Sequence, residues 1–220
     1  MPAKLKKEIE KLKDKVLKLG AEVESSVRLA VKSVLERDSS MAEKVIEHDN
    51  DIDDFEVEIE EDCLKVLALH QPVAIDLRFI VAVLKINSDL ERIGDLAVNI
   101  AEREVIISSK RDTGFPTGFE EMSDKAQIML RKSLEALINL DTGIAREVID
   151  MDDELDNLNR DMYDRVKEGI RAKIENLTCM VQYFTIARNL ERIGDLATNI
   201  CEDVIYMVDG EIVRHQLSSG

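Results

Sequence analysis

The sequence contains no tryptophan, and only 4% of its 220 residues are aromatic, although 45% are hydrophobic. The core must therefore be built mainly from Leu, Ile, Val and Ala, which suit packed helices. Proline and glycine are also scarce, with three and nine residues, so that long stretches can form uninterrupted helices. These deficits favour an all-α protein.

Several features that indicate other protein classes are missing. The longest strongly apolar run, from Phe79 to Leu84, is far too short to cross a bilayer. The N-terminal stretch lacks the apolar segment of a signal peptide. The three cysteines form no C-x-x-C pair, and we interpret them as buried apolar residues in a reducing compartment. We therefore expect a cytoplasmic protein without direct membrane insertion.

Positive charge is in deficit, because 46 Asp and Glu stand against 30 Lys and Arg and give a formal net charge of −16. This balance argues against binding to nucleic acid or anionic lipid, since each would add repulsion. A bound cation or a basic protein partner fits it better. The sequence also shows no nucleophile elbow, phosphate-binding loop or dinucleotide fingerprint. We therefore expect a protein that is not an enzyme.

What the sequence does contain is an internal repeat. Nine of the ten residues from Glu91 to Ile100 recur from Glu191 to Ile200, at an offset of 100. Farther upstream, the stretch from Val45 to Phe55 aligns with Val148 to Leu158 at an offset of 103. A repeat of this length indicates two similar structural units in tandem.

Apolar residues in both copies follow the period of a helix. In the first copy they are spaced 4-3-4-3 from Ile86 to Ile100, and the second copy repeats this spacing. Asp38 and Asp141 stand at equivalent positions where a helix should begin, as N-caps. Pro72 fits the first turn of the third helix of the first copy. Each half is therefore predicted to form three helices.

Between the two copies, residues 108–118 are rich in Ser, Gly and Thr and include a proline, which is typical of a linker. We therefore expect two tandem, antiparallel three-helix bundles. The first should comprise residues 1–110 and the second residues 119–220, joined by a linker at residues 111–118.

Pairs of carboxylates separated by four residues stand at matching positions of the two copies. On a helix the two members of a pair lie only about 40° apart around the axis, on the side away from the apolar stripe. Neighbouring helices of one half would lie about 8–10 Å apart, so two pairs could converge at one place in each half. The residues concerned are Asp49, Asp53, Glu91 and Asp95 in the first half, and Asp152, Asp156, Glu191 and Asp195 in the second.

The recurrence of these pairs favours a function over a solvated acidic face. Like charges at this spacing destabilise a helix by about 0.2–0.5 kcal/mol per pair, and a bound cation would offset the repulsion. Ligation by oxygen alone suits hard metals such as Mg²⁺, Mn²⁺ or iron rather than a thiolate zinc site. An EF-hand from Asp49 to Glu60 is disfavoured, because Asp54 stands where that loop requires glycine.

Taken together, these motifs resemble the PhoU family, the accessory and regulatory proteins of bacterial phosphate-specific transport. The resemblance covers about residues 20–215. It rests on the two L-E-R-I-G-D-L-A-x-N-I copies, the paired carboxylates, H-Q-P-V-A-I-D-L-R and the late Y-M-V-D-G-E-I-V-R-H. It implies two three-helix bundles related by a pseudo-twofold axis, often in a homodimer. It also implies metal, including multinuclear iron or zinc clusters, on the eight carboxylates given above.

The resemblance further implies repression of the phosphate-starvation response, through the ATPase subunit of the phosphate ABC transporter and a sensor histidine kinase. We therefore predict a non-enzymatic, metal-binding adaptor that regulates phosphate uptake, with iron, Mn, Mg or Zn as candidate metals. Two alternatives stay open. One is a carboxylate-bridged metalloenzyme, which would need an open coordination position and an enclosed pocket. The other is a helical scaffold without metal.

Overall fold

The computed structural model describes residues 3–110, 114–211 and 213, and the described residues form helices and no strand. This confirms the predicted all-α class. The long helices are α1 (Ala3–Glu36), α2 (Ser39–His70), α3 (Ile75–Ser108), α4 (Phe119–Asn139), α5 (Thr142–Ala172) and α6 (Leu177–Asp209), and a short 3₁₀ helix, η1 (Ile174–Asn176), precedes α6.

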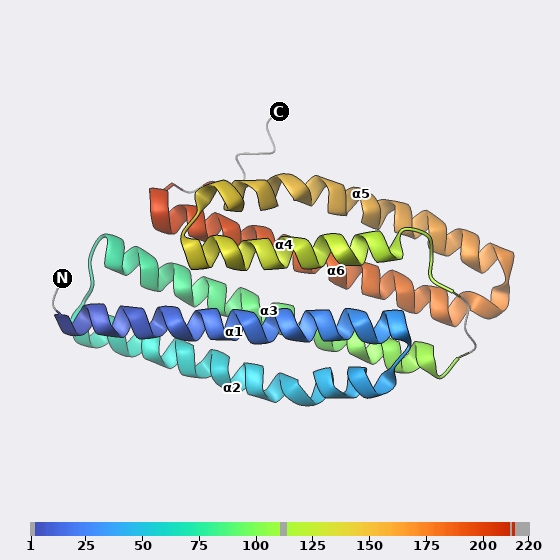
Figure 1. The fold of residues 1–220 in the computed structure, drawn as a ribbon, viewed down its shortest axis with the longest axis horizontal. Helices are drawn as coiled ribbons and strands as arrows, with labels where there is room; N and C mark the ends of the chain where they lie inside the picture. Colours follow the sequence, from blue (N-terminus) through green and yellow to red (C-terminus); the bar gives the residue numbers. More distant parts are fainter. Residues whose placement is uncertain (1–2, 111–113, 212, 214–220) are drawn as a thin grey trace.

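The helices form two antiparallel three-helix bundles that lie side by side along the long axis of the molecule (Figure 1). The first bundle consists of α1, α2 and α3, and the second of α4, α5 and α6, related by a pseudo-twofold axis. Along the seam between them α3 packs on α6, and α1 packs on α4. Helices α2 and α5 therefore lie on the outer sides of the molecule (Figure 1).

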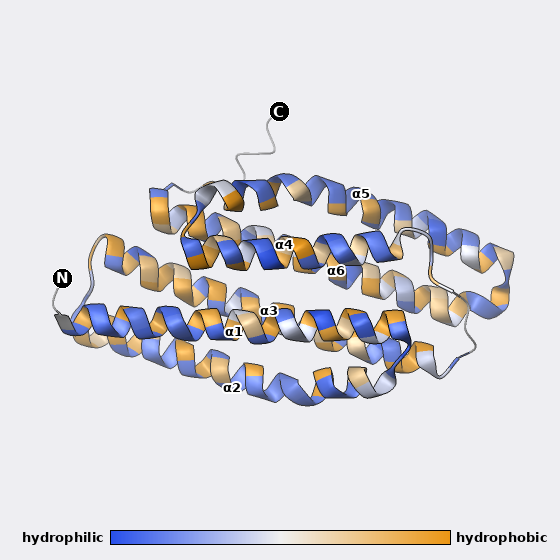
Figure 2. Ribbon diagram, in the orientation of Figure 1, coloured by the Kyte–Doolittle hydropathy of each residue, from blue (hydrophilic) through white to orange (hydrophobic). Residues whose placement is uncertain are grey.

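The core is made of the aliphatic residues that the composition predicted. One continuous cluster of buried side chains, mostly Leu, Ile, Val, Ala and Met, extends through both bundles and across the seam. Hydrophobic residues recur along each helix between hydrophilic stretches, as the helical period requires (Figure 2). Among the described residues no helix is both long and apolar enough to span a membrane.

The two predicted N-caps are confirmed. Asp38 Oδ1 accepts hydrogen bonds from the backbone N–H groups of Ser40 and Met41, at 2.9 and 3.3 Å. Asp141 Oδ1 accepts from Gly143 and Ile144 at the start of α5, at 2.8 and 3.1 Å. These bonds satisfy backbone donors that a helix leaves free in its first turn.

The prediction for Pro72 was wrong. Pro72 lies in the turn after α2 ends at His70, and α3 begins only at Ile75. Gln71 and Ala74, on either side of it, have positive φ angles of 45° and 51°. A proline disfavours helical backbone at the residue before it, so the chain leaves α2 there and completes a turn before the next helix.

The predicted linker is described only in part. Residues 111–113 lie outside the described residues, and residues 114–118 lead into α4. Just beyond them, Phe119 stacks on Phe115 with ring centroids 5.7 Å apart, and Tyr183 of α6 meets both rings edge-on. These three aromatic residues thus pack the start of α4 against α6. The division into two domains stays a prediction.

Candidate metal centres

The repeated glycine of E-R-I-G-D lets the carboxylate-bearing helices approach each other. A Cβ atom on Gly94 of α3 would lie 3.3 Å from Ile52 Cγ2 and 3.8 Å from Asp49 Oδ1 of α2. In the second half a Cβ atom on Gly194 would overlap with Leu155 of α5. A side chain at Gly194 would therefore overlap with the adjacent helix, and one at Gly94 would make a tight contact with it, so both glycines allow the helices that carry the acidic pairs to approach closely. The sequence showed this glycine in both copies, but its role became visible only from the packing.

In the first bundle the structure brings the predicted residues of α2 and α3 together. Burial raises the pKa of Asp49, and the negative charges of Asp53 and Asp95 raise it further. Burial, then Asp53, raises the pKa of Asp95. For Glu91 the causes are burial, then Asp95, Asp53 and Glu56, opposed by Arg92. Carboxylates from both helices thus lie close enough to repel one another.

The second bundle repeats this arrangement on α5 and α6. Burial and the charges of Asp195, Asp156, Asp153 and Glu191, in that order, raise the pKa of Asp152 from 3.8 to about 6. Burial also raises the pKa of Glu191 and of Asp195, with Asp156 adding to both and Arg192 opposing both. Asp53, Asp95 and Asp195 are exposed and the other five predicted ligands are half-buried, so a cation can reach them from solvent.

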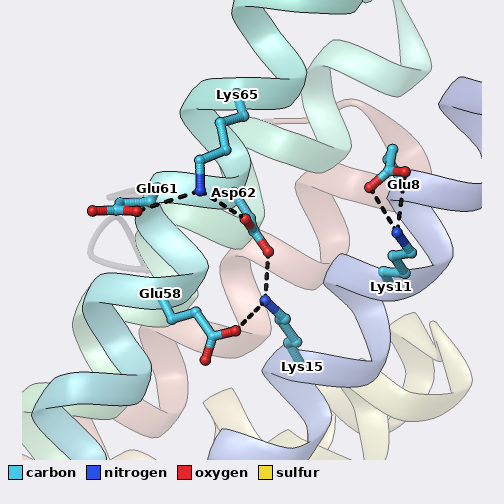
Figure 3. Close-up of polar contacts among 7 residues, drawn as sticks. All are labelled: Glu8, Lys11, Lys15, Glu58, Glu61, Asp62 and Lys65. Carbon is cyan, nitrogen blue, oxygen red and sulfur yellow. Dashed lines mark hydrogen bonds and ion pairs between the residues drawn. The ribbon is translucent and has the colours of Figure 1, made fainter.

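Another acidic pair with the same spacing, Glu58 and Asp62, is neutralised by lysines instead of facing other acids. Glu58 and Asp62 of α2 both bind Lys15 of α1, and Lys65 also reaches Asp62 (Figure 3). Hydrogen bonds from Lys15 and Lys65 lower the pKa of Asp62. By contrast, among the described residues no Lys or Arg forms an ion pair with a predicted ligand of the first bundle. In the second, Arg160 lies 3.4 Å from Asp156.

The donors in both clusters are carboxylate oxygens, which suit a hard cation. Cysteine is a poor candidate, because burial raises the pKa of Cys63 and of Cys201 to about 12 and disfavours the thiolate. His48 lies on the α1 side of α2, with Nδ1 3.0 Å from Asp51 and Nε2 3.4 Å from Glu22. The part of the chain that the structure describes holds no group of three or more such side chains already gathered around a metal position.

Two polar residues beside the first cluster were missed from the sequence. Glu56 follows Asp49 and Asp53 on α2 and contributes to the raised pKa of Glu91. Asn87 of α3 donates from Nδ2 to Oε1 of Glu56 at 2.8 Å and to its backbone oxygen at 3.0 Å. The prediction relied on positions that recur in both copies, and these two do not. The sequence signal for them was their helical spacing from predicted ligands, since Glu56 follows Asp49 by seven residues and Asn87 precedes Glu91 by four.

An open cavity of about 600 Å³ lies on the seam between α3 and α6. None of the eight predicted ligands lines it. Its lining residues are Leu84, Lys85, Ser88, Asp89, Arg92, Asn199 and Glu202. The carboxylate clusters themselves therefore do not form part of this cavity.

The family model described as the PhoU domain matches the chain twice, at residues 16–103 and 119–204. A protein of Aquifex aeolicus named phosphate-specific transport system accessory protein PhoU homolog is 37% identical over 213 residues, covering 97% of this chain and 96% of that protein. A protein of the same name from Clostridium acetobutylicum is 32% identical over 207 residues, covering 94% of each.

Solved structures agree with these sequence relatives. The crystal structure of PhoU from Pseudomonas aeruginosa matches with a TM-score of 0.89 at 32% identity, over 94% of this chain and 99% of that one. The phosphate transport system regulatory protein PhoU from Streptococcus pneumoniae matches with a TM-score of 0.84 at 29% identity, over 95% of this chain and 99% of that one.

Proposed function

Because the chain belongs to the PhoU family, we propose that it is a non-enzymatic, metal-binding adaptor that regulates phosphate uptake. The family assignment confirms the resemblance drawn from the sequence. The regulatory role is supported by the names of its relatives, which describe accessory and regulatory proteins of phosphate transport. Those relatives match nearly the whole of this chain, so the role is proposed for the entire molecule.

In this proposal the protein acts in the cytoplasm as a negative regulator of the phosphate-starvation response. Its partners are the ATPase subunit of the phosphate ABC transporter and a sensor histidine kinase, and it works as a homodimer. The acidic surface supports a partner with a basic face, since a net charge of −16 favours association with positive charge.

The observation that carries the metal-binding part is the mutual repulsion of the carboxylates. Burial, and then the charges of its acidic neighbours, raise the pKa of Asp152 to about 6 and so disfavour its ionised form. A cation between the helices would remove this penalty and would join α2 to α3 and α5 to α6. The proposed ligands are Asp49, Asp53, Glu91 and Asp95 for one centre, and Asp152, Asp156, Glu191 and Asp195 for the other. Iron, Mn, Mg and Zn remain the candidate metals.

A complementation experiment tests the function. Deleting the gene should leave phosphate uptake unregulated and the starvation response active in high phosphate, and the wild-type gene should restore both. A variant carrying Asp95→Asn and Asp195→Asn should restore them poorly, because each centre loses a ligand. The matched control, Glu58→Gln with Asp62→Asn, removes two acids of α2 that bind Lys15 instead, and it should restore regulation fully. Normal uptake and a normal starvation response in the deletion strain would contradict the proposal.

A further inference from the structure

The two carboxylate clusters are not equivalent beyond the four residues that recur. The offset of 103 places Asn159 of the second copy at the position of Glu56, and the offset of 100 places Ala187 at the position of Asn87. Glu56 comes seven residues after Asp49, so the two side chains lie about 20° apart around the axis of α2. The first bundle therefore continues its acidic row where the second bundle does not.

Glu56 belongs electrostatically to the first cluster. Burial, then the charges of Glu60 and Asp53, raise its pKa, while the hydrogen bond from Asn87 lowers it. Glu56 in turn acts on Glu91 across the helix interface. It thus lies within reach of proposed ligands on both α2 and α3.

Packing alone does not require an amide at position 87, because an apolar residue could fill the same space. Its side chain is fully buried, and both hydrogen bonds from Nδ2 go to Glu56. Its Oδ1 is buried without a hydrogen-bond partner among the described residues, which is destabilising. The second copy fills the same position with Ala187 and avoids this cost. A buried amide that donates one hydrogen bond to the Glu56 carboxylate and one to the Glu56 backbone oxygen fixes the position of that carboxylate.

We infer that Glu56 is a fifth carboxylate ligand of the first centre, held by Asn87, and that the first centre therefore binds a hard cation more tightly than the second. The inference rests on the proposed metal binding. An added anionic ligand raises the affinity of an oxygen-ligand site, and a partner that orients a ligand contributes about 10–100-fold to affinity. Asn87 is a positioning residue in this arrangement, because it acts through Glu56.

Titration of the metal-free, full-length protein with Mn²⁺ alone tests the inference, with free Mn²⁺ followed by its paramagnetic resonance signal. The wild type should show a tight and a weak class of site. Asp95→Asn should remove the tight class and Asp195→Asn the weak one, which assigns each class to a bundle. Glu56→Gln and Asn87→Ala should each weaken the tight class about 10–100-fold and leave the weak class unchanged.

Three further variants sharpen the test. Asp54→Asn is the matched control, because it removes an acid of α2 that lines a cavity on the α1 side, and it should change neither class. Asn159→Glu should strengthen the weak class. In a Glu56→Gln background Asn87→Ala should have little further effect, because its target carboxylate is gone. A purely structural role of Asn87 would leave its effect undiminished there.

Each outcome decides the question. If Glu56→Gln changes Mn²⁺ binding no more than Asp54→Asn does, Glu56 is not a ligand, although metal binding itself stands. If the tight class belongs to the second bundle, the order of affinities is overturned. If the wild type binds no Mn²⁺, the metal proposal fails and this inference with it. Should Asn87→Ala melt early in chelator, Glu56→Gln and Asn159→Glu alone decide.

Discussion

Single carboxylates in this chain differ in character according to their neighbours. Asp62 has its pKa lowered by hydrogen bonds from Lys15 and Lys65, whereas Asp152 has its pKa raised to about 6 by burial and by other acids. Both belong to pairs with helical spacing, so spacing alone does not distinguish them. The difference lies in what faces them from the adjacent helix, and it separates a solvated ion pair from a candidate ligand.

The variant with Asp95→Asn and Asp195→Asn tests the proposed ligands through stability. In chelator it should be as stable as the wild type or slightly more stable, by about 0.2–0.5 kcal/mol per pair, because repulsion is relieved. With Mn²⁺ at a hundredfold excess over Kd the wild type should gain about 2.7 kcal/mol, and the variant should lose most of that gain. Reversible denaturant titrations measure both values.

The pH dependence provides a control for this comparison. Burial, and then the neighbouring acids, raise the pKa of Asp152 from its ordinary value of 3.8 to about 6 in the folded chain. As the pH falls, Asp152 of the folded protein is therefore protonated at a higher pH than an ordinary aspartate. A protonated carboxylate binds metal poorly, so the gain in stability from Mn²⁺ should shrink as the pH falls through about 6. An equal response of both proteins to Mn²⁺ at pH 7 would show that these two aspartates are not ligands.

Whole helices were predictable from the sequence because their apolar residues recur at one period over thirty or so residues. Interactions between helices were less accessible. Gly94 and Gly194 belong to the repeated motif, but only the packing shows that α2 contacts α3 at Gly94 and that α5 contacts α6 at Gly194. The turn at Pro72 was placed wrongly, because the positive φ angles beside it leave no trace in hydrophobic periodicity. Recurrence singled out the eight proposed ligands but not Glu56 and Asn87, whose positions differ in the second copy.

At the level of these helix contacts, Gly194→Ala should destabilise the protein. Its Cβ atom would overlap with the buried Leu155, and Met129 limits the room for adjustment. Overpacking of this kind costs about 1–3 kcal/mol, against a gain in helix propensity of up to about 1 kcal/mol. Gly94→Ala, whose nearest neighbour would be 3.3 Å away, should be nearly neutral. Denaturant titrations of both variants in chelator measure the difference.

The contact between Gly194 and Leu155 can be tested by shortening Leu155, which should relieve the overlap. In a Leu155→Val background, which shortens the obstructing side chain, Gly194→Ala should cost clearly less than in the wild type. If the cost is unchanged, the strain does not arise from the approach of α5 to α6, and the role given to this glycine is wrong.

At the scale of the whole molecule, the two bundles pack against each other along the seam between α3 and α6. The buried cluster continues across the seam between α3 and α6. Lys85 of α3 also pairs with Asp203 of α6, with Nζ 3.0 Å from Oδ1, and Asp203 is 1% exposed. The equivalent positions in the other copy are Thr185 and Arg103. A contact that the repeat does not duplicate could not be predicted from it.

Cutting the linker should therefore not separate the halves. With a protease site inserted within residues 111–118, cleavage should give two fragments that elute together in gel filtration, because the seam remains buried. Asp203→Ala should weaken this association by about 1.5–3 kcal/mol, since it removes the hydrogen bond between charged groups that Lys85 makes across the seam. The matched control is Asp209→Ala on the same helix, whose partner Arg146 lies in its own bundle, and it should have no effect. If the two fragments of a chain without the Asp203→Ala change separate from each other after cleavage, the linker, and not the seam, holds the bundles together.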